Sequence, residues 1–143
     1  MAEAGRRNIP VLIVEDNRER QDILKNLFRD HAWILVNTAE RAIRLVKAYT
    51  FEIICLDYDL AGPGNGEDVA RAVLETKSKK TYILIHSMNG PGADKIKAIL
   101  PESVCVPINQ MIRSNAAFKN LREQIGFVPN INWKAVFQHR NSG

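Results

Sequence analysis

A short apolar run that ends in two acids sets the fold of this chain: Val11-Leu12-Ile13-Val14-Glu15-Asp16-Asn17. Four consecutive aliphatic residues are typical of a strand that is buried on both faces of a sheet. Two further apolar runs have the same form, since residues 53–56 precede Asp57 and residues 82–86 precede Ser87. If these strands are parallel neighbours, their polar ends share one crevice, which is where open α/β sheets bind ligands.

Short apolar runs alternate with amphipathic helical patterns along the chain, and this alternation predicts a parallel sheet covered by helices on both faces. We expect strands at 11–14, 33–36, 53–56, 82–86 and 104–106, and the first helix at 18–30. Thr38 is expected to cap the second helix. The compositions of 61–66 and 89–92 predict loops. The last long helix is expected to run from Met111 to Ile125. Five βα units of this length fit a flavodoxin-like three-layer (βα)5 fold with strand order 2-1-3-4-5.

Composition indicates one soluble domain, with 143 residues, 45% hydrophobic and 25% charged. No apolar run approaches the ~20 residues that span a bilayer, and the start lacks a secretory signal, so we expect a cytoplasmic protein without membrane contact. The net charge of +4 is small, and the densest basic run, at 77–80, has no interleaved aromatics, which disfavours a nucleic-acid partner. Cys55 and Cys105 lie in apolar runs and are predicted to be buried free thiols.

The tail at 126–143 lies outside the βα pattern, because Pro129 and Asn130 separate it from the last helix. Trp133, Val136 and Phe137 have i, i+3, i+4 spacing, which predicts a short amphipathic helix. We expect this helix to pack back on the domain; the alternative is a homodimer or partner contact.

Residues 9–125 resemble a response-regulator receiver domain. Residues 11–17 resemble its opening strand, residues 56–60 followed by Gly66 resemble its phospho-acceptor segment, and residues 85–87 match its switch position. The resemblance implies that Asp57 accepts a phosphoryl group from a histidine kinase or phosphotransfer protein, and that Ser87 contacts this group and reorients. It also implies a Mg²⁺ site made by Glu15, Asp16, Asp57 and the backbone carbonyl of Asp59.

The chemistry of an acid cluster supports the same prediction. A carboxylate is a poor nucleophile toward a phosphoryl group of like charge, and a divalent cation that bridges the two removes this repulsion. Mg²⁺ commonly uses one or two carboxylates together with substrate oxygens and waters.

Two departures from the receiver pattern stand out. The Lys-Pro that follows the fifth strand of receivers is here Val106-Pro107, and valine cannot contact a phosphoryl group. Lys95 and Arg113 are the candidates for a replacement. The loop after Leu60 lacks the usual proline, and Ala61 stands there instead.

His86 and Asn89 open an alternative. With Asp57, they resemble an atypical receiver branch proposed to process cyclic phosphates on nucleotides or nucleic acids. His86 would be its general acid, because an imidazole titrates near neutral pH. Since successive strand residues point to opposite faces, the pattern favours a packed His86 that faces a covering helix, and Asn89 as a turn residue.

Three functions follow, in order of support. The first is a single-domain phosphorelay receiver that catalyses only its own phosphorylation, with output through contact with a downstream protein. The second is a degenerate receiver that serves as a protein-binding module, which Val106 favours. The third is a metal-dependent cyclic-phosphate phosphoesterase, which His86 and Asn89 favour.

Overall fold

Five parallel strands form the centre of the molecule in the computed structural model, which describes residues 8–76, 81–133 and 136. The strands are β1 (Pro10–Val14), β2 (Ala32–Val36), β3 (Ile53–Leu56), β4 (Tyr82–Ile85) and β5 (Val104–Cys105). The helices are α1 (Arg18–Leu27), α2 (Ala39–Ala48), α3 (Gly66–Glu75), α4 (Gly90–Ile99), α5 (Ile108–Met111) and α6 (Asn115–Ile125).

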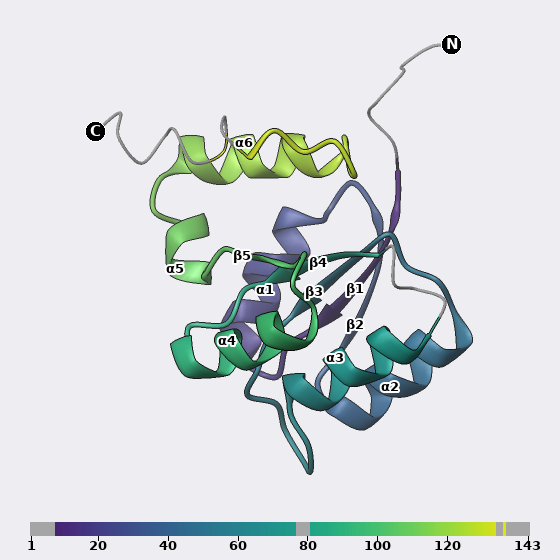
Figure 1. The fold of residues 1–143 in the computed structure, drawn as a ribbon. Coiled ribbons are helices and arrows are strands. Elements are labelled where there is room, and N and C mark those ends of the chain that lie inside the picture. The colour runs from purple at the N-terminus through teal and green to yellow at the C-terminus, as the bar shows by residue number, and fades with distance from the viewer. Residues whose placement is uncertain (1–7, 77–80, 134–135, 137–143) are drawn as a thin grey trace.

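The strands lie in the order β2-β1-β3-β4-β5, which confirms the predicted flavodoxin-like topology. Figure 1 shows the sheet between two layers of helices, with α2 and α3 side by side below it and α6 above it. One core, which includes Ile13, Leu24 and Leu121, joins the sheet to α1, α5 and α6. The other, which includes Leu12, Val69 and Ile96, joins it to α2, α3 and α4. Successive residues of β1 thus serve opposite faces, as strand geometry requires.

Short polar side chains fix where the helices begin. Asn17, Thr38, Asn65 and Ser114 each accept a hydrogen bond from a backbone N–H in the first turn of the following helix. These bonds satisfy donors that have no partner within the helix. The N-cap at Thr38 confirms the start expected from the sequence.

The segment 89–92 was expected to be a loop, but it forms the beginning of α4. Asn89 caps the helix by accepting a hydrogen bond from the Gly92 N–H at 3.0 Å, and Pro91 lies in the first turn. Proline is tolerated there because its missing N–H would have no partner within the helix. The asparagine and proline that predicted a loop here are also residues that favour the start of a helix.

The remaining elements differ from the predictions mainly at their ends. The helix expected at 18–30 ends at Leu27. The single long helix expected at the end of the domain is divided into two helices, because Ser114 caps the start of α6 after the short α5. Cys55 is buried, but Cys105 is exposed on the edge strand β5. The prediction of two buried thiols was therefore wrong for Cys105.

Part of the tail lies against the core. Val136 is buried there, and the Trp133 ring stacks on Tyr82 with 6.0 Å between ring centroids. Phe137, the third residue of the predicted amphipathic pattern, lies outside the described residues, as do the basic residues 77–80. Among the residues that are described, no helix has the length and apolar character needed to cross a membrane.

Gly66 brings the start of α3 against the end of β3. Its N–H donates to the Tyr58 carbonyl at 2.7 Å, and a Cβ at this position would lie 2.3 Å from the Asp57 carbonyl oxygen. Because that atom belongs to the backbone, it cannot move aside as a side chain can. We expect Gly66→Ala to lower the free energy of unfolding by about 1–3 kcal/mol in urea denaturation.

Gly90 provides the matched control, since a Cβ there would meet nothing within 4 Å. Gly90→Ala is expected to leave stability unchanged or raise it by up to about 1 kcal/mol. Equal effects of the two substitutions would contradict the packing argument.

Candidate functional site

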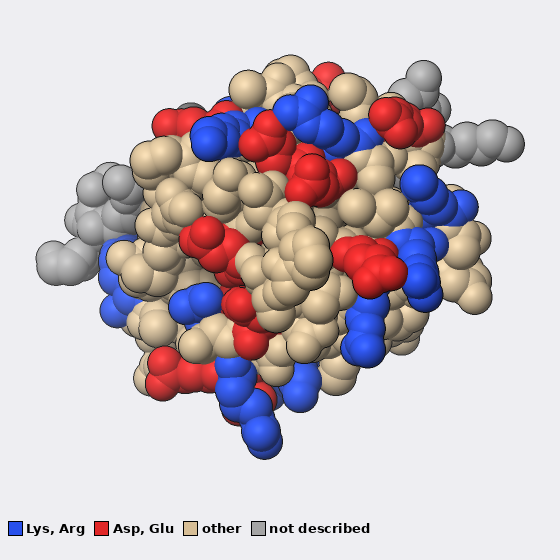
Figure 2. Space-filling model, turned by 90° about the horizontal axis from the view of Figure 1, so that it is seen from below, with Lys and Arg blue, Asp and Glu red and all other residues tan. Residues whose placement is uncertain are grey.

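The predicted acids meet beyond the carboxyl ends of β1 and β3. Ligand atoms of Glu15, Asp57 and His86 all lie within 4.8 Å of one another. Arg20, in the first turns of α1, has ion-pair contacts with Glu15, Asp16 and Asp57. Figure 2 views the molecule from below, the side on which the loop after β3 projects in Figure 1, and shows acidic side chains across the middle of this face. The structure thus brings Glu15 and Asp57 together, and Arg20 links Asp16 to them.

A chain of buried contacts holds Glu15 in place. Its Oε1 lies 2.8 Å from Nε2 of His86 and accepts a hydrogen bond from Nε of Arg20 at 3.1 Å. Its Oε2 accepts the Asn17 N–H at 2.9 Å. On the other side of the imidazole, Nδ1 of His86 lies 3.2 Å from the Cys55 thiol. Glu15 and His86 are both fully buried, so this pair is shielded from water.

Burial and pairing oppose each other in this ion pair. Burial acts to raise the pKa of Glu15, but hydrogen bonds from His86 and Arg20 outweigh it and lower that pKa to about 2. Burial also opposes protonation of His86, yet its contacts with Cys55 and Glu15 raise its pKa to about 10. At neutral pH the pair is therefore a carboxylate and an imidazolium, as expected when each charged form is bonded to the other.

Asp57 is nearly buried at the end of β3. Its Oδ1 accepts the Tyr58 N–H at 2.8 Å, and Nη2 of Arg20 lies 3.7 Å from Oδ2. Burial raises the pKa of Asp57, as does the nearby Glu15 carboxylate, while His86 and the Ser87 hydroxyl oppose the rise. Burial together with Glu15 likewise raises the pKa of the exposed Asp16. A raised pKa means that the charged form of the carboxylate is poorly stabilised, so a bound cation stabilises such a carboxylate strongly.

His86 follows strand alternation, because its contact with Cys55 puts it on the face of Leu84, opposite to Ile85. The packed, hydrogen-bonded histidine predicted from the sequence is present, but it packs against the acids and not away from them. Glu15 follows Val14 as His86 follows Ile85, so both side chains lie on this same face of the sheet, and they meet just past the ends of β1 and β4. Both ring nitrogens have partners and the residue has no exposed surface, so His86 cannot act as a general acid on a ligand in the crevice beyond the strands.

Ser87 is buried next to Asp57, and Asn89 lies beside it. The Ser87 hydroxyl accepts the Asn89 N–H at 3.1 Å, and the Asn89 side-chain amide donates to Oδ2 of Asp59 at 3.1 Å. Asn89 is thus engaged in capping α4 and in holding Asp59. These bonds connect the loops that follow β3 and β4.

The positive charge beside the acids comes from residues that the sequence did not single out for this purpose. Val106 is buried in the apolar core, Lys95 Nζ lies 5.8 Å from the Tyr58 ring centroid, and Arg113 lies between α5 and α6. Arg20 contacts the acids instead. Its spacing of four residues from Asp16, on a predicted helix, was the available signal.

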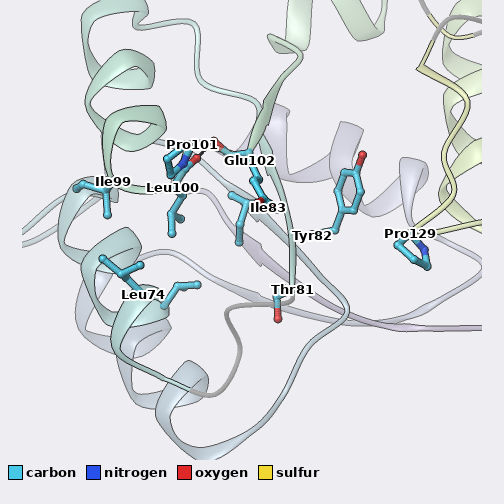
Figure 3. Close-up of a pocket in the computed structure, with 11 residues that line it drawn as sticks. Leu74, Thr81, Tyr82, Ile83, Ile99, Leu100, Pro101, Glu102 and Pro129 are labelled. Atoms are coloured by element: carbon cyan, nitrogen blue, oxygen red, sulfur yellow. Dashed lines mark hydrogen bonds between the residues drawn. The ribbon is translucent and has the colours of Figure 1, made fainter.

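One cavity of the molecule lies apart from this site. It holds about 490 Å³ and is lined mainly by apolar residues, with Leu74, Ile83, Leu100 and Pro129 among them. Figure 3 shows its lining at the start of β4 and the end of α4, which is the opposite end of the parallel sheet from the acids. The candidate site lies instead in the crevice beyond the carboxyl ends of the strands, where open α/β sheets bind ligands, and we call this crevice the cleft.

Comparisons with solved structures place this fold among receiver domains. The receiver domain of the sensor histidine kinase PA1611 from Pseudomonas aeruginosa, solved with a magnesium ion in its active-site cleft, is similar with a TM-score of 0.65 and 17% identity, over 85% of this chain and 98% of that one. The response regulator TrrA from Thermotoga maritima in complex with Mg²⁺ and BeF has a TM-score of 0.60 and 17% identity, over 78% and 97%.

A third receiver domain, from a putative Luxo repressor protein of Vibrio parahaemolyticus, has 22% identity and a TM-score of 0.60, over 81% of this chain and 92% of that one. Among curated proteins, none matches the sequence. These likenesses establish the fold.

The strand order is the one expected of a receiver domain, and the similar solved structures are receiver domains. The family model for the cyclic-phosphate processing receiver domain matches residues 11–102, and the chain belongs to that family.

Proposed function

We propose that this protein binds Mg²⁺ at the acid cluster and accepts a phosphoryl group on Asp57 from a histidine kinase or phosphotransfer protein. One observation carries the proposal: the Asp57 carboxylate is fixed through Oδ1, has Arg20 beside Oδ2, and lies next to Glu15 and Ser87. This is a nucleophile held among groups that can neutralise phosphoryl oxygens.

The donor atoms of the cluster fit Mg²⁺. This ion prefers oxygen ligands and keeps several waters, so one or two carboxylates suffice. Asp16 is exposed and Asp57 reaches the cleft, and these two would hold the ion together with the Asp59 carbonyl. Both carboxylate oxygens of Glu15 already accept hydrogen bonds, so Glu15 would act through a water. When bound, Mg²⁺ supplies charge neutralisation between nucleophile and phosphoryl group.

The chain's own residues account for the rest of the transfer. An Asp57 carboxylate oxygen attacks phosphorus, and the bond from phosphorus to the donor's imidazole nitrogen breaks, so that nitrogen keeps the electron pair. Positioning and charge stabilisation dominate such transfers. Ser87, beside Asp57, is placed to donate a hydrogen bond to a phosphoryl oxygen.

Intact-mass spectrometry after incubation with acetyl phosphate and Mg²⁺ tests this proposal. We expect a mass gain of one phosphoryl group that disappears in Asp57→Asn and in the presence of EDTA. Asp22→Asn makes the same chemical change at an exposed acid of α1, and should leave the gain intact. Because some receivers refuse small donors, a phosphorylated histidine phosphotransfer protein is the second donor. No gain with either donor would overturn the proposal.

A second candidate is hydrolysis of a cyclic phosphodiester at the same cleft. The family description favours it, as do Ser87, next to Asp57, and the Asn89–Asp59 bond. Hydrolysis of a 2′,3′-cyclic nucleotide that requires Mg²⁺ and is lost in Asp57→Asn would support it. If neither reaction occurs while Mg²⁺ still binds through Asp57, the remaining function is that of a receiver domain that serves as a protein-binding module.

A further inference from the structure

Arg20 is the partly exposed cation that lies against the acids of this site. Its guanidinium has contacts with three carboxylates: Nε is 3.1 Å from Oε1 of Glu15, and Nη2 is 3.7 Å from Oδ2 of Asp57 and 3.9 Å from Oδ1 of Asp16. The side chain is 34% exposed, so a ligand in the cleft can reach it.

The guanidinium is anchored at one end and open at the other. The bond from Nε goes to Glu15, which His86 and the Asn17 N–H hold in turn. The contacts of Nη2 with Asp16 and Asp57 exceed the length of a hydrogen bond, so they are electrostatic. The planar fork of arginine suits phosphoryl oxygens, and here its outer edge lies beside the oxygen of Asp57 that is not bonded to Tyr58.

Among the described residues, three other positions that could have carried the charge are less well placed. His86 is fully buried behind Glu15, and position 106 is a buried valine. Lys95 lies over the Tyr58 ring. Within the described residues, the ion pairs with these acids come from Arg20 and His86, and of the two only Arg20 reaches the surface.

We propose that Arg20 is a catalytic residue that contacts the phosphoryl oxygens of the group transferred to Asp57, in place of the lysine that Val106 cannot supply. Before ligands bind, the same guanidinium is the counter-ion of Asp16 and Asp57 and competes with the divalent cation for them. This inference rests on the proposed function and adds a residue to its site.

The two roles have effects of opposite sign when the charge is removed. Without Arg20, the acids lose a competing cation, so Mg²⁺ should bind several-fold more tightly, since unit charges about 4 Å apart interact appreciably near a protein surface. Phosphoryl transfer loses a donor to its charged oxygens, and single donors of this kind contribute about 100-fold in rate. A residue with a merely structural role would weaken both properties together.

The test compares wild type, Arg20→Gln, Arg20→Lys and Arg18→Gln. Arg18 is exposed on the same helix, so Arg18→Gln makes the same charge change away from the acids. Isothermal titration calorimetry gives the Kd for Mg²⁺ alone, and mass spectrometry gives the phosphorylation rate at saturating Mg²⁺ with the donor that labels wild type. We expect Arg20→Gln to lower the Kd several-fold and slow phosphorylation about 100-fold, with Arg18→Gln close to wild type in both.

Arg20→Lys keeps the charge without the fork, and covers the case in which Arg20→Gln does not fold. It should bind Mg²⁺ like wild type and be phosphorylated more slowly. A rate within about twofold of wild type in both Arg20 variants, or weaker Mg²⁺ binding in Arg20→Gln, would overturn the role of Arg20. If wild type itself takes no phosphoryl group from either donor, the proposed function fails instead, which is a separate outcome.

Discussion

Replacing His86 with alanine is expected to lower the free energy of unfolding by about 3–5 kcal/mol. The substitution removes the 2.8 Å contact with Glu15 and leaves that carboxylate fully buried with Arg20 and the Asn17 N–H as its remaining partners. It also leaves a void beside the Cys55 thiol, which adds a packing cost. Removing one member of a buried ion pair costs far more than the intact pair contributes, because the other charge remains in a poorly solvated place.

Urea denaturation in EDTA measures this effect. Arg44→Ala is the control, because it breaks an ion pair with Glu40 whose side chains are 76% and 72% exposed. Its cost should stay within about 0.5 kcal/mol. The double variant Glu15→Gln with His86→Ala should recover part of the loss, since it removes the unpaired charge. A loss under about 1 kcal/mol in His86→Ala would show that the pair is not held as described.

Alkaline pH is expected to destabilise the metal-free protein. His86 has a folded-state pKa of about 10 against an ordinary value of 6.5. A raised pKa means that the folded state holds the proton more tightly, so this stabilisation is fully present below about pH 6.5 and is lost as pH rises toward 10. The loss is on the order of several kcal/mol over that window. The pKa of Glu15 is lowered, so the stability that this carboxylate contributes is lost at acid pH, when it becomes protonated.

Unfolding free energies from pH 6 to 10 test this expectation, again in EDTA. His86→Gln has no titrating group at this position, so its profile should be flatter than that of wild type over the same window. Parallel profiles for the two proteins would place the alkaline dependence elsewhere in the molecule.

Much of the fold could be predicted from local sequence. Strand positions and strand order could be predicted from apolar runs that end in polar residues. The start of α2 could be predicted because threonine is a common N-cap residue, and Thr38 is the N-cap of that helix. The failures came where one local signal has two structural uses. Asn89, Gly90 and Pro91 serve a turn or a helix start equally well, and Met111 fits helical spacing with α6 although Ser114 interrupts the backbone.

The proximity of the acids could be predicted, because the carboxyl ends of parallel strands lie at the same edge of the sheet whatever their side chains are. The charged and polar groups that surround the acids could not be predicted. The contacts of His86 with Glu15, across 71 positions of sequence, and with Cys55 depend on how the sheet brings the strand ends together. Strand alternation predicts the face on which His86 lies, but it does not predict that the Glu15 side chain reaches the imidazole on that face.

The sequence by itself determined the topology, the acid cluster and the loss of the receiver lysine at Val106, because these depend on residue type and order along the chain. Only the tertiary structure decided which cations lie against the acids. A long side chain such as Arg20 can reach several acids, and the pKa of the buried His86 is raised only because Cys55 and Glu15 are held against its imidazole. Both outcomes depend on distances between separate elements, and those distances exist only in the folded protein.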